Sequence, residues 1–134
     1  MLVLIASALA AAVSWLGNRA ALHFIGIKGI IVAGPLVEEA AKSGAAVLTG
    51  SSLVLTHGAF GLIEGIYDAW GGGAKAVPAA LVSLFGHLFY GYVAYLTWRK
   101  QGVFWAAVLA GYVVHMLWNL TVLRFVVSKR RKTV

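Results

Sequence analysis

Long apolar stretches separated by short polar breaks run along the whole chain and predict membrane-spanning helices. A helix needs about 20 apolar residues to cross the hydrocarbon core of a bilayer. Turn-forming or charged residues interrupt the apolar pattern near 17–19, 49–52, 71–75 and 99–102. The pattern therefore predicts a single transmembrane helical domain over residues 1–134, with five spans at about 1–17, 29–50, 52–70, 77–98 and 103–127.

Composition favours an all-α membrane protein and excludes a large soluble domain. Of the 134 residues, 61% are hydrophobic and 11% are charged, whereas a soluble domain has about 25% charged residues. The absence of cysteine excludes cysteine nucleophiles and cysteine-ligated metals. The first apolar segment has no basic region before it, so we expect a retained helix rather than a cleaved signal peptide.

The net charge is +7. Most basic residues lie at the ends of the apolar segments, as expected for the cytoplasmic side of a membrane protein rather than for a nucleic-acid-binding face. With the N-terminus outside, the inner side would hold seven Lys and Arg residues and the outer side two. This asymmetry predicts an N-out, C-in bundle of about five helices. We expect an integral, multi-pass protein of a prokaryotic cytoplasmic membrane, surrounded by the lipid bilayer and without a nucleic-acid partner.

All acidic side chains of the chain lie inside apolar segments, and this placement points to a function. The four acids are Glu38, Glu39, Glu64 and Asp68. A charged group at the bilayer centre costs at least ~2.5–3.5 kcal/mol on insertion scales, and such groups usually mark functional sites. Gly61 and Gly65 have the GxxxG spacing of closely packed helices, so we assign them to packing.

Counting residues along alternating spans places polar groups from four helices in one layer. At 1.5 Å per residue, a first set falls roughly 13–15 Å from the inner boundary; it comprises Glu38, Glu39, His87 and His115. Glu64 and Asn119 come out at about 8–9 Å from that boundary. His23 and His57 are expected to be interhelical hydrogen-bonding groups. Glu64 and Asp68 could also pack against Lys75 or a histidine.

The residue types in this layer suit hydrolysis by an activated water. A carboxylate beside a neutral histidine can act as a general base, and a histidine with a carboxamide can stabilise an oxyanion. His115 and Asn119 are four residues apart and share a helix face. Lys42 follows the Glu pair by one turn and can neutralise one of its carboxylates. The HExxH motif is absent, so no metal site is assigned, although Glu and His as ligand types leave zinc open.

Four segments occur in the order of a known family's motifs: GPLVEEAAK (34–42), GAFGLIEG (58–65), LFGHLFYG (84–91) and VHMLWN (114–119). The chain resembles the PrsW-type intramembrane proteases, relatives of the type II CAAX prenyl endopeptidases in the CPBP/Abi group. The resemblance implies a membrane-embedded, glutamate-type peptidase without a cofactor. One Glu of the pair, Glu38 rather than Glu39, would activate water with His87. His115 and Asn119 would form the oxyanion hole, with Lys42 and Glu64 in support.

The substrate of such an enzyme would be a membrane-anchored or prenylated protein. The chain is short for this family, which leaves a homo-oligomer open. Two other classes compete with the hydrolase: a non-enzymatic transporter that uses buried Glu and His as a proton or cation pathway, and a catalytically silent scaffold that binds other helices. Asn119 cannot titrate, so it suits an oxyanion hole better than a proton relay.

Overall fold

The computed structural model describes the backbone of residues 1–71 and 76–131, and these residues are almost entirely helical. The side chains of 27–31, 68, 71, 76, 79, 123 and 125–131 lie outside the description. No strand occurs within the described ranges. The helices are α1 (Leu2–Ile25), α2 (Ile27–Thr49), α3 (Leu53–Gly71), α4 (Ala76–Gln101) and α5 (Phe104–Arg131).

The length and apolar composition of several helices are those of membrane-spanning helices. Three helices contain a stretch that is long and apolar enough to cross a bilayer: Leu2–Ile25, Ala80–Gln101 and Phe104–Val122. Helix α3 contributes the shorter apolar stretch Leu53–Tyr67. Helix α2 is 23 residues long, but the charged side chains in its middle set it apart from the three apolar helices.

The predicted break at residues 17–19 is wrong, because α1 continues through it to Ile25. Gly17 lies where α1 meets α2, and a Cβ atom there would be 2.5 Å from the side chain of Val37. The polar residue that follows, Asn18, donates a hydrogen bond to Glu38 of α2. The chain turns instead at Gly26, whose φ of +75° lies in the left-handed region that favours glycine. The other expected spans agree with α2 to α5 to within a few residues at each end.

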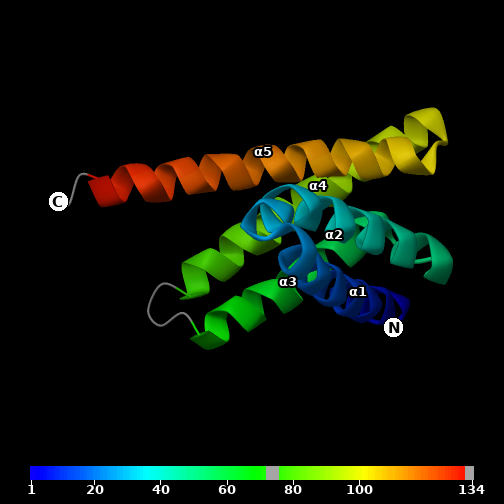
Figure 1. Ribbon diagram of the computed structural model, residues 1–134. Helices are drawn as coiled ribbons and strands as arrows, with labels where there is room; N and C mark the ends of the chain where they lie inside the picture. Colours follow the sequence, from blue (N-terminus) through cyan, green and yellow to red (C-terminus); the bar gives the residue numbers. More distant parts are fainter. Residues whose placement is uncertain (72–75, 132–134) are drawn as a thin grey trace.

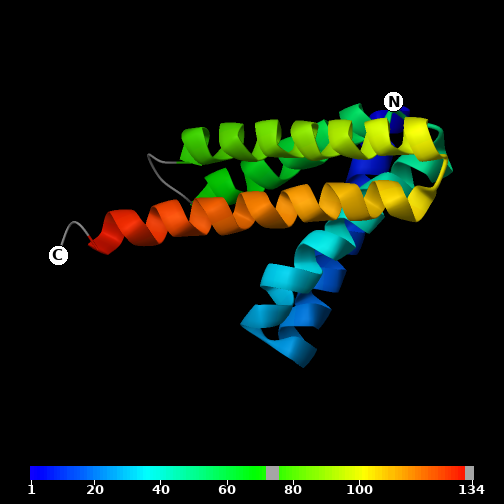
Figure 2. The same ribbon diagram turned by 90° about the horizontal axis from the view of Figure 1, so that it is seen from above.

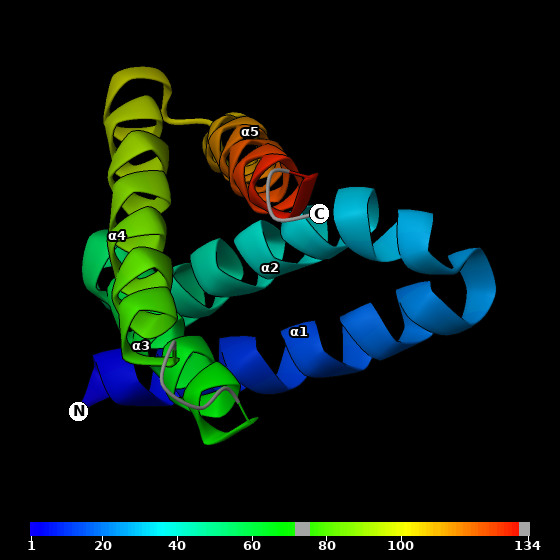
Figure 3. The same ribbon diagram turned by 90° about the vertical axis from the view of Figure 1, so that its left-hand side faces the viewer.

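The helices form two hairpins and one further helix. Helices α1 and α2 pair with each other, as do α3 and α4, and α5 packs against α4 and α2 (Figure 1). In the view of Figure 2, the α1–α2 hairpin runs obliquely to α3, α4 and α5. Figure 3 shows the same steep crossing between α4 and the α1–α2 hairpin. Because α2 contacts α1, α3 and α5, its middle lies where the helices converge.

Small residues bring α3 and α4 close together, as the glycine spacing predicts. A Cβ atom at Gly65 would lie 2.9 Å from the Cα atom of Ala80, and one at Gly61 would lie 2.8 Å from the Cβ of His87. Such distances are shorter than carbon atoms tolerate, so a larger residue would force the two helices apart.

We therefore expect Gly65→Ala to lower the free energy of unfolding by about 1–3 kcal/mol through overpacking. The matched control is Gly44→Ala in α2, where an added Cβ meets no described atom within 4 Å. In that open helical position alanine should be neutral or stabilising by up to about 1 kcal/mol. Unfolding of both variants in detergent micelles measures the difference, and equal stability of the two would contradict this packing.

Candidate functional site

A cavity of about 610 Å³ beside the middle of α2 is lined by five of the seven predicted site residues. These are Glu38 from α2, Glu64 from α3, His87 from α4, and His115 and Asn119 from α5. The other two, Glu39 and Lys42, lie fully buried behind the cavity wall. Side chains from four helices thus converge on one place, although up to 81 residues of sequence separate them.

Glu39 and Lys42 form a buried ion pair at the centre of the bundle. The Nζ atom of Lys42 lies 2.5 Å from Oε1 of Glu39, and neither side chain is exposed. The same oxygen is 2.9 Å from Nδ1 of His115, and Oε2 is 3.4 Å from Nδ1 of His57. Gly111 of α5 passes so close that a Cβ atom there would be 2.7 Å from Oε2. A carboxylate enclosed in this way holds its neighbours in position.

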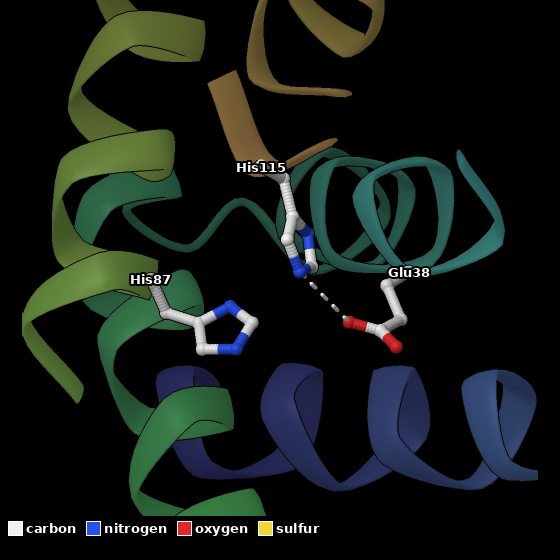
Figure 4. A group of neighbouring side chains, drawn as sticks. All are labelled: Glu38, His87 and His115. Atoms are coloured by element: carbon white, nitrogen blue, oxygen red, sulfur yellow. Dashed lines mark ion pairs between the residues drawn. The ribbon is translucent and has the colours of Figure 1, made fainter. Parts of the chain in front are cut away.

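Glu38, the other member of the pair, has one occupied and one free oxygen. Its Oε1 atom accepts a hydrogen bond of 3.1 Å from the Nδ2 atom of Asn18. Its Oε2 atom accepts none from the described residues, although the side chain is nine-tenths buried. Figure 4 shows this carboxylate turned toward His115, with Oε2 at 3.9 Å from Nε2. Glu38, which lines the cavity, therefore keeps one buried carboxylate oxygen without a hydrogen-bond partner among the described residues.

The contact between His115 and Glu39 fixes which ring nitrogen carries hydrogen. An ionised carboxylate only accepts hydrogen bonds, so the 2.9 Å contact to Glu39 places hydrogen on Nδ1. In the neutral ring, Nε2 then carries a lone pair and faces Glu38. The ring of Tyr90 stacks on that of His115, with centroids 4.6 Å apart and an interplanar angle of 15°. This stacking restricts rotation of the imidazole.

His87 has partners for both ring nitrogens. Its Nδ1 lies 2.9 Å from Nζ of Lys42, and its Nε2 lies 2.7 Å from Oε2 of Glu64. Since the ammonium only donates and the carboxylate only accepts, the hydrogen sits on Nε2. Ser83 donates a further hydrogen bond of 2.8 Å to the same oxygen of Glu64. The direct partners of His87 are thus Lys42 and Glu64, whereas the prediction from the sequence is that it acts together with Glu38.

Asn119 follows His115 by one helical turn and lines the same cavity. The predicted shared face of these two residues is what brings both to the cavity wall. The carboxamide of Asn119 is a donor that a group bound in this cavity can reach.

Sequence reasoning missed two contributors, Asn18 and Ser83. Asn18 lies in the break that the sequence predicts after the first span. The apolar residues that continue on both sides of Asn18 are the signal that would have placed it on the face of a helix. His57 is confirmed as an interhelical hydrogen-bonding group, since its Nε2 is 3.3 Å from Oγ of Ser43. His23 is exposed and lies edge-on to the ring of Phe24.

Glu64 contacts a histidine, His87, which is one of the two kinds of partner expected for it. The side chain of Asp68 and the whole of Lys75 lie outside the described residues.

Three side chains approach the arrangement of a metal site. Glu38, His87 and His115 each offer a ligand atom, and these atoms lie within 4.8 Å of one another (Figure 4). His115 suits this role, because Nε2 is free and Nδ1 donates to a carboxylate as in many metal sites. His87 does not, because Glu64 and the Lys42 ammonium occupy its two nitrogens. The group therefore supplies two oriented ligands, and zinc sites need at least three, so we assign no metal.

Comparisons with models of protein families, with curated proteins and with solved structures gave no match. The side chains of the site are therefore what indicates a function.

Proposed function

We propose that the protein is a glutamate-dependent intramembrane endopeptidase of the PrsW type, which hydrolyses a peptide bond of a membrane-anchored or prenylated protein. The observation that carries the proposal is the free Oε2 atom of Glu38. It belongs to a residue that lines a cavity of about 610 Å³ and lies 3.9 Å from the Nε2 atom of His115. A general base needs such a free acceptor within reach of the proton that it removes.

The spacing of these two acceptors suits one water molecule between them. A water that donates a hydrogen bond of about 2.8 Å to each of two acceptors separates them by about 4.4 Å. The observed 3.9 Å between Oε2 of Glu38 and Nε2 of His115 is about half an ångström shorter than this. In the proposal, the oxygen of a water held in this way would attack the carbonyl carbon of a substrate bound in the cavity.

In the proposed reaction, the water oxygen attacks the carbonyl carbon as its proton passes to Glu38 or His115. The same proton is then delivered to the leaving amine. Glu39 stabilises the imidazolium of His115 whenever that ring holds two protons, since its Oε1 is 2.9 Å from Nδ1. Asn119 donates to the developing oxyanion. In this proposal, His115 assists the base and does not form the oxyanion hole, because its Nε2 atom accepts a hydrogen bond rather than donating one.

The proposed setting is the cytoplasmic membrane of a prokaryote, with all five helices spanning in an N-out, C-in topology. Three helices are apolar enough to cross unaided. Helix α2 would cross with its charges turned into the bundle, where Lys42 and Glu39 neutralise each other. The distribution of Lys and Arg at the ends of the segments supports this orientation.

Reconstitution into lipid nanodiscs with a panel of transmembrane and prenylated reporter peptides tests the proposal. Cleavage in water labelled with ¹⁸O should place one label in the new carboxyl group, and chelators should leave the rate unchanged. Loss of activity with a chelator and recovery with zinc would replace the glutamate mechanism by a metal mechanism. Absence of cleavage across the panel, together with proton flux abolished by Glu38→Gln, would instead identify a transporter.

A further inference from the structure

Two hydrogen-bond donors at the site have no part in the reaction described above, namely the hydroxyl of Tyr90 and the indole N–H of Trp118. Tyr90 belongs to α4 and Trp118 to α5, and both residues line the cavity of about 610 Å³. A phenol hydroxyl can donate a hydrogen bond, and an indole N–H can only donate. Neither Tyr90 Oη nor Trp118 Nε1 has a hydrogen-bond partner among the described residues.

A glycine one turn before Tyr90 brings these two donors together. Long side chains on a helix lean back over the preceding turn, and Gly86 has no side chain to obstruct the Tyr90 ring. A Cβ atom at Gly86 would lie 2.6 Å from Tyr90 Oη and 3.4 Å from Trp118 Nε1. Both donors therefore lie beside the same glycine, at the contact between α4 and α5.

The hydroxyl of Tyr90 is accessible although the residue is buried. Tyr90 is 2% exposed, but its Oη atom is not fully enclosed by protein, unlike the partnerless Oε2 atom of Glu38. The small accessible part of Tyr90 thus includes the hydroxyl, and the cavity is the space that this residue lines. Stacking of the ring on His115 holds the hydroxyl in one position.

The two donors lie toward the same end of the cavity as Asn119. The lean of Tyr90 carries its hydroxyl toward the beginning of α4. Since α4 and α5 run in opposite directions (Figure 2), that direction is the one in which α5 leads from His115 to Trp118 and Asn119. Three donors from two helices therefore line the same cavity as the proposed base.

We propose that Tyr90 Oη and Trp118 Nε1 are further catalytic donors, which act with Asn119 to bind the carbonyl oxygen of the scissile peptide bond and to stabilise its negative charge in the transition state. This inference rests on the proposed peptidase function. Neither donor gives up its proton, and each hydrogen bond strengthens while the carbonyl oxygen carries charge. Donors held in position before the reaction are usually the largest single contribution to such catalysis.

A peptide in a membrane supplies the acceptor that these donors need. Its scissile bond must leave the helical conformation to be attacked, and a backbone carbonyl that leaves a helix in lipid is costly without a donor. A buried donor without an acceptor costs about 1–3 kcal/mol in its turn. Binding of the carbonyl oxygen at Tyr90 and Trp118 offsets both costs.

Conservative variants test the catalytic role with the reporter peptides in nanodiscs. Tyr90→Phe keeps the ring that stacks on His115 and removes only the hydroxyl, whereas Trp118→Phe removes the indole N–H. We expect each to lower the rate of cleavage by about 10²-fold, mainly in kcat. The matched controls are Tyr92→Phe in α4 and Trp105→Phe in α5, which do not line the cavity and should keep the wild-type kcat.

Binding of two uncleavable analogues separates donation to the carbonyl from general packing. In one analogue of a cleaved reporter the scissile amide is replaced by a ketomethylene group, which keeps the carbonyl oxygen, and in the other by an ethylene group, which lacks it. The wild type should bind the ketomethylene peptide more tightly. Tyr90→Phe and Trp118→Phe should each reduce this preference about three- to tenfold, the value of one hydrogen bond. Equal weakening of both analogues would show a packing role alone and would overturn the inference.

The outcomes also distinguish this inference from the proposed function. Unfolding temperatures close to that of the wild type show that the variants are folded. If the wild type cleaves reporters and both Tyr90→Phe and Trp118→Phe keep its rate, the hydrolase stands and the two donors have no part in it. If the wild type cleaves no reporter, the proposed function is rejected and this inference is rejected with it.

Discussion

Glu38→Gln is expected to lower the rate of reporter cleavage by about 10²- to 10⁴-fold, the usual contribution of a general base. The amide keeps the size of the side chain and can still accept the hydrogen bond from Asn18 Nδ2 that Oε1 receives at 3.1 Å. It cannot take a proton from water. The loss should therefore appear in kcat, whereas the unfolding temperature should stay close to that of the wild type.

The control for this prediction is the same substitution at the other carboxylate of the cavity, Glu64→Gln. Glu64 is the partner of His87 Nε2 at 2.7 Å, so its loss disturbs His87 rather than the proposed base. We expect an effect smaller by at least tenfold than that of Glu38→Gln. Wild-type cleavage by Glu38→Gln, or equal losses in the two variants, would show that Glu38 is not the base.

The second large effect concerns stability, in the buried pair of Glu39 and Lys42. Removal of one partner leaves an uncompensated charge, and such a change typically costs about 3–5 kcal/mol. We expect Glu39→Gln and Lys42→Met each to lower the free energy of unfolding by about this amount. Both side chains are completely buried, so solvent cannot take the place of the missing partner.

The double variant Glu39→Gln/Lys42→Met separates this ion pair from a general loss of packing. With both charges gone, no unpaired ion remains. The loss in free energy of unfolding of the double variant should therefore be smaller, by at least about 1 kcal/mol, than the sum of the losses of the two single variants. Unfolding in mixed detergent, followed by circular dichroism, gives all four free energies. Strict additivity would show that the two residues act independently.

Most of the helices could be predicted from sequence because an apolar pattern depends on local spacing. The rise per residue also predicts which polar groups lie at similar heights along their helices. The pairings inside the site could not be predicted in this way. Glu38 and Glu39 are neighbours in sequence but point about 100° apart around the helix axis. Which of them faces a cavity depends on where α1 and α5 pack.

Two particular pairings show this limit. The contact of Asn18 with Glu38 depends on α1 continuing through an apparent break, and it joins residues 20 positions apart. Lys42 is close enough in sequence to either glutamate, yet it pairs with Glu39 and also reaches His87 on another helix. Helix packing decides both outcomes, and residue spacing contains no information about it.

The position of Lys42 has a consequence for how the chain enters a membrane during synthesis. Its ammonium contacts Glu39 of its own helix, His87 of α4 and the face of Phe60 of α3, while Glu39 contacts His115 of α5. When the synthesis of α2 has just ended, the last three of these partners have not yet been made. A charged group in lipid without partners is costly, so, in the proposed five-span topology, α2 would gain its full stabilisation only after α5 has followed. In that topology, the buried polar cluster would be completed only when the last helix has entered the membrane.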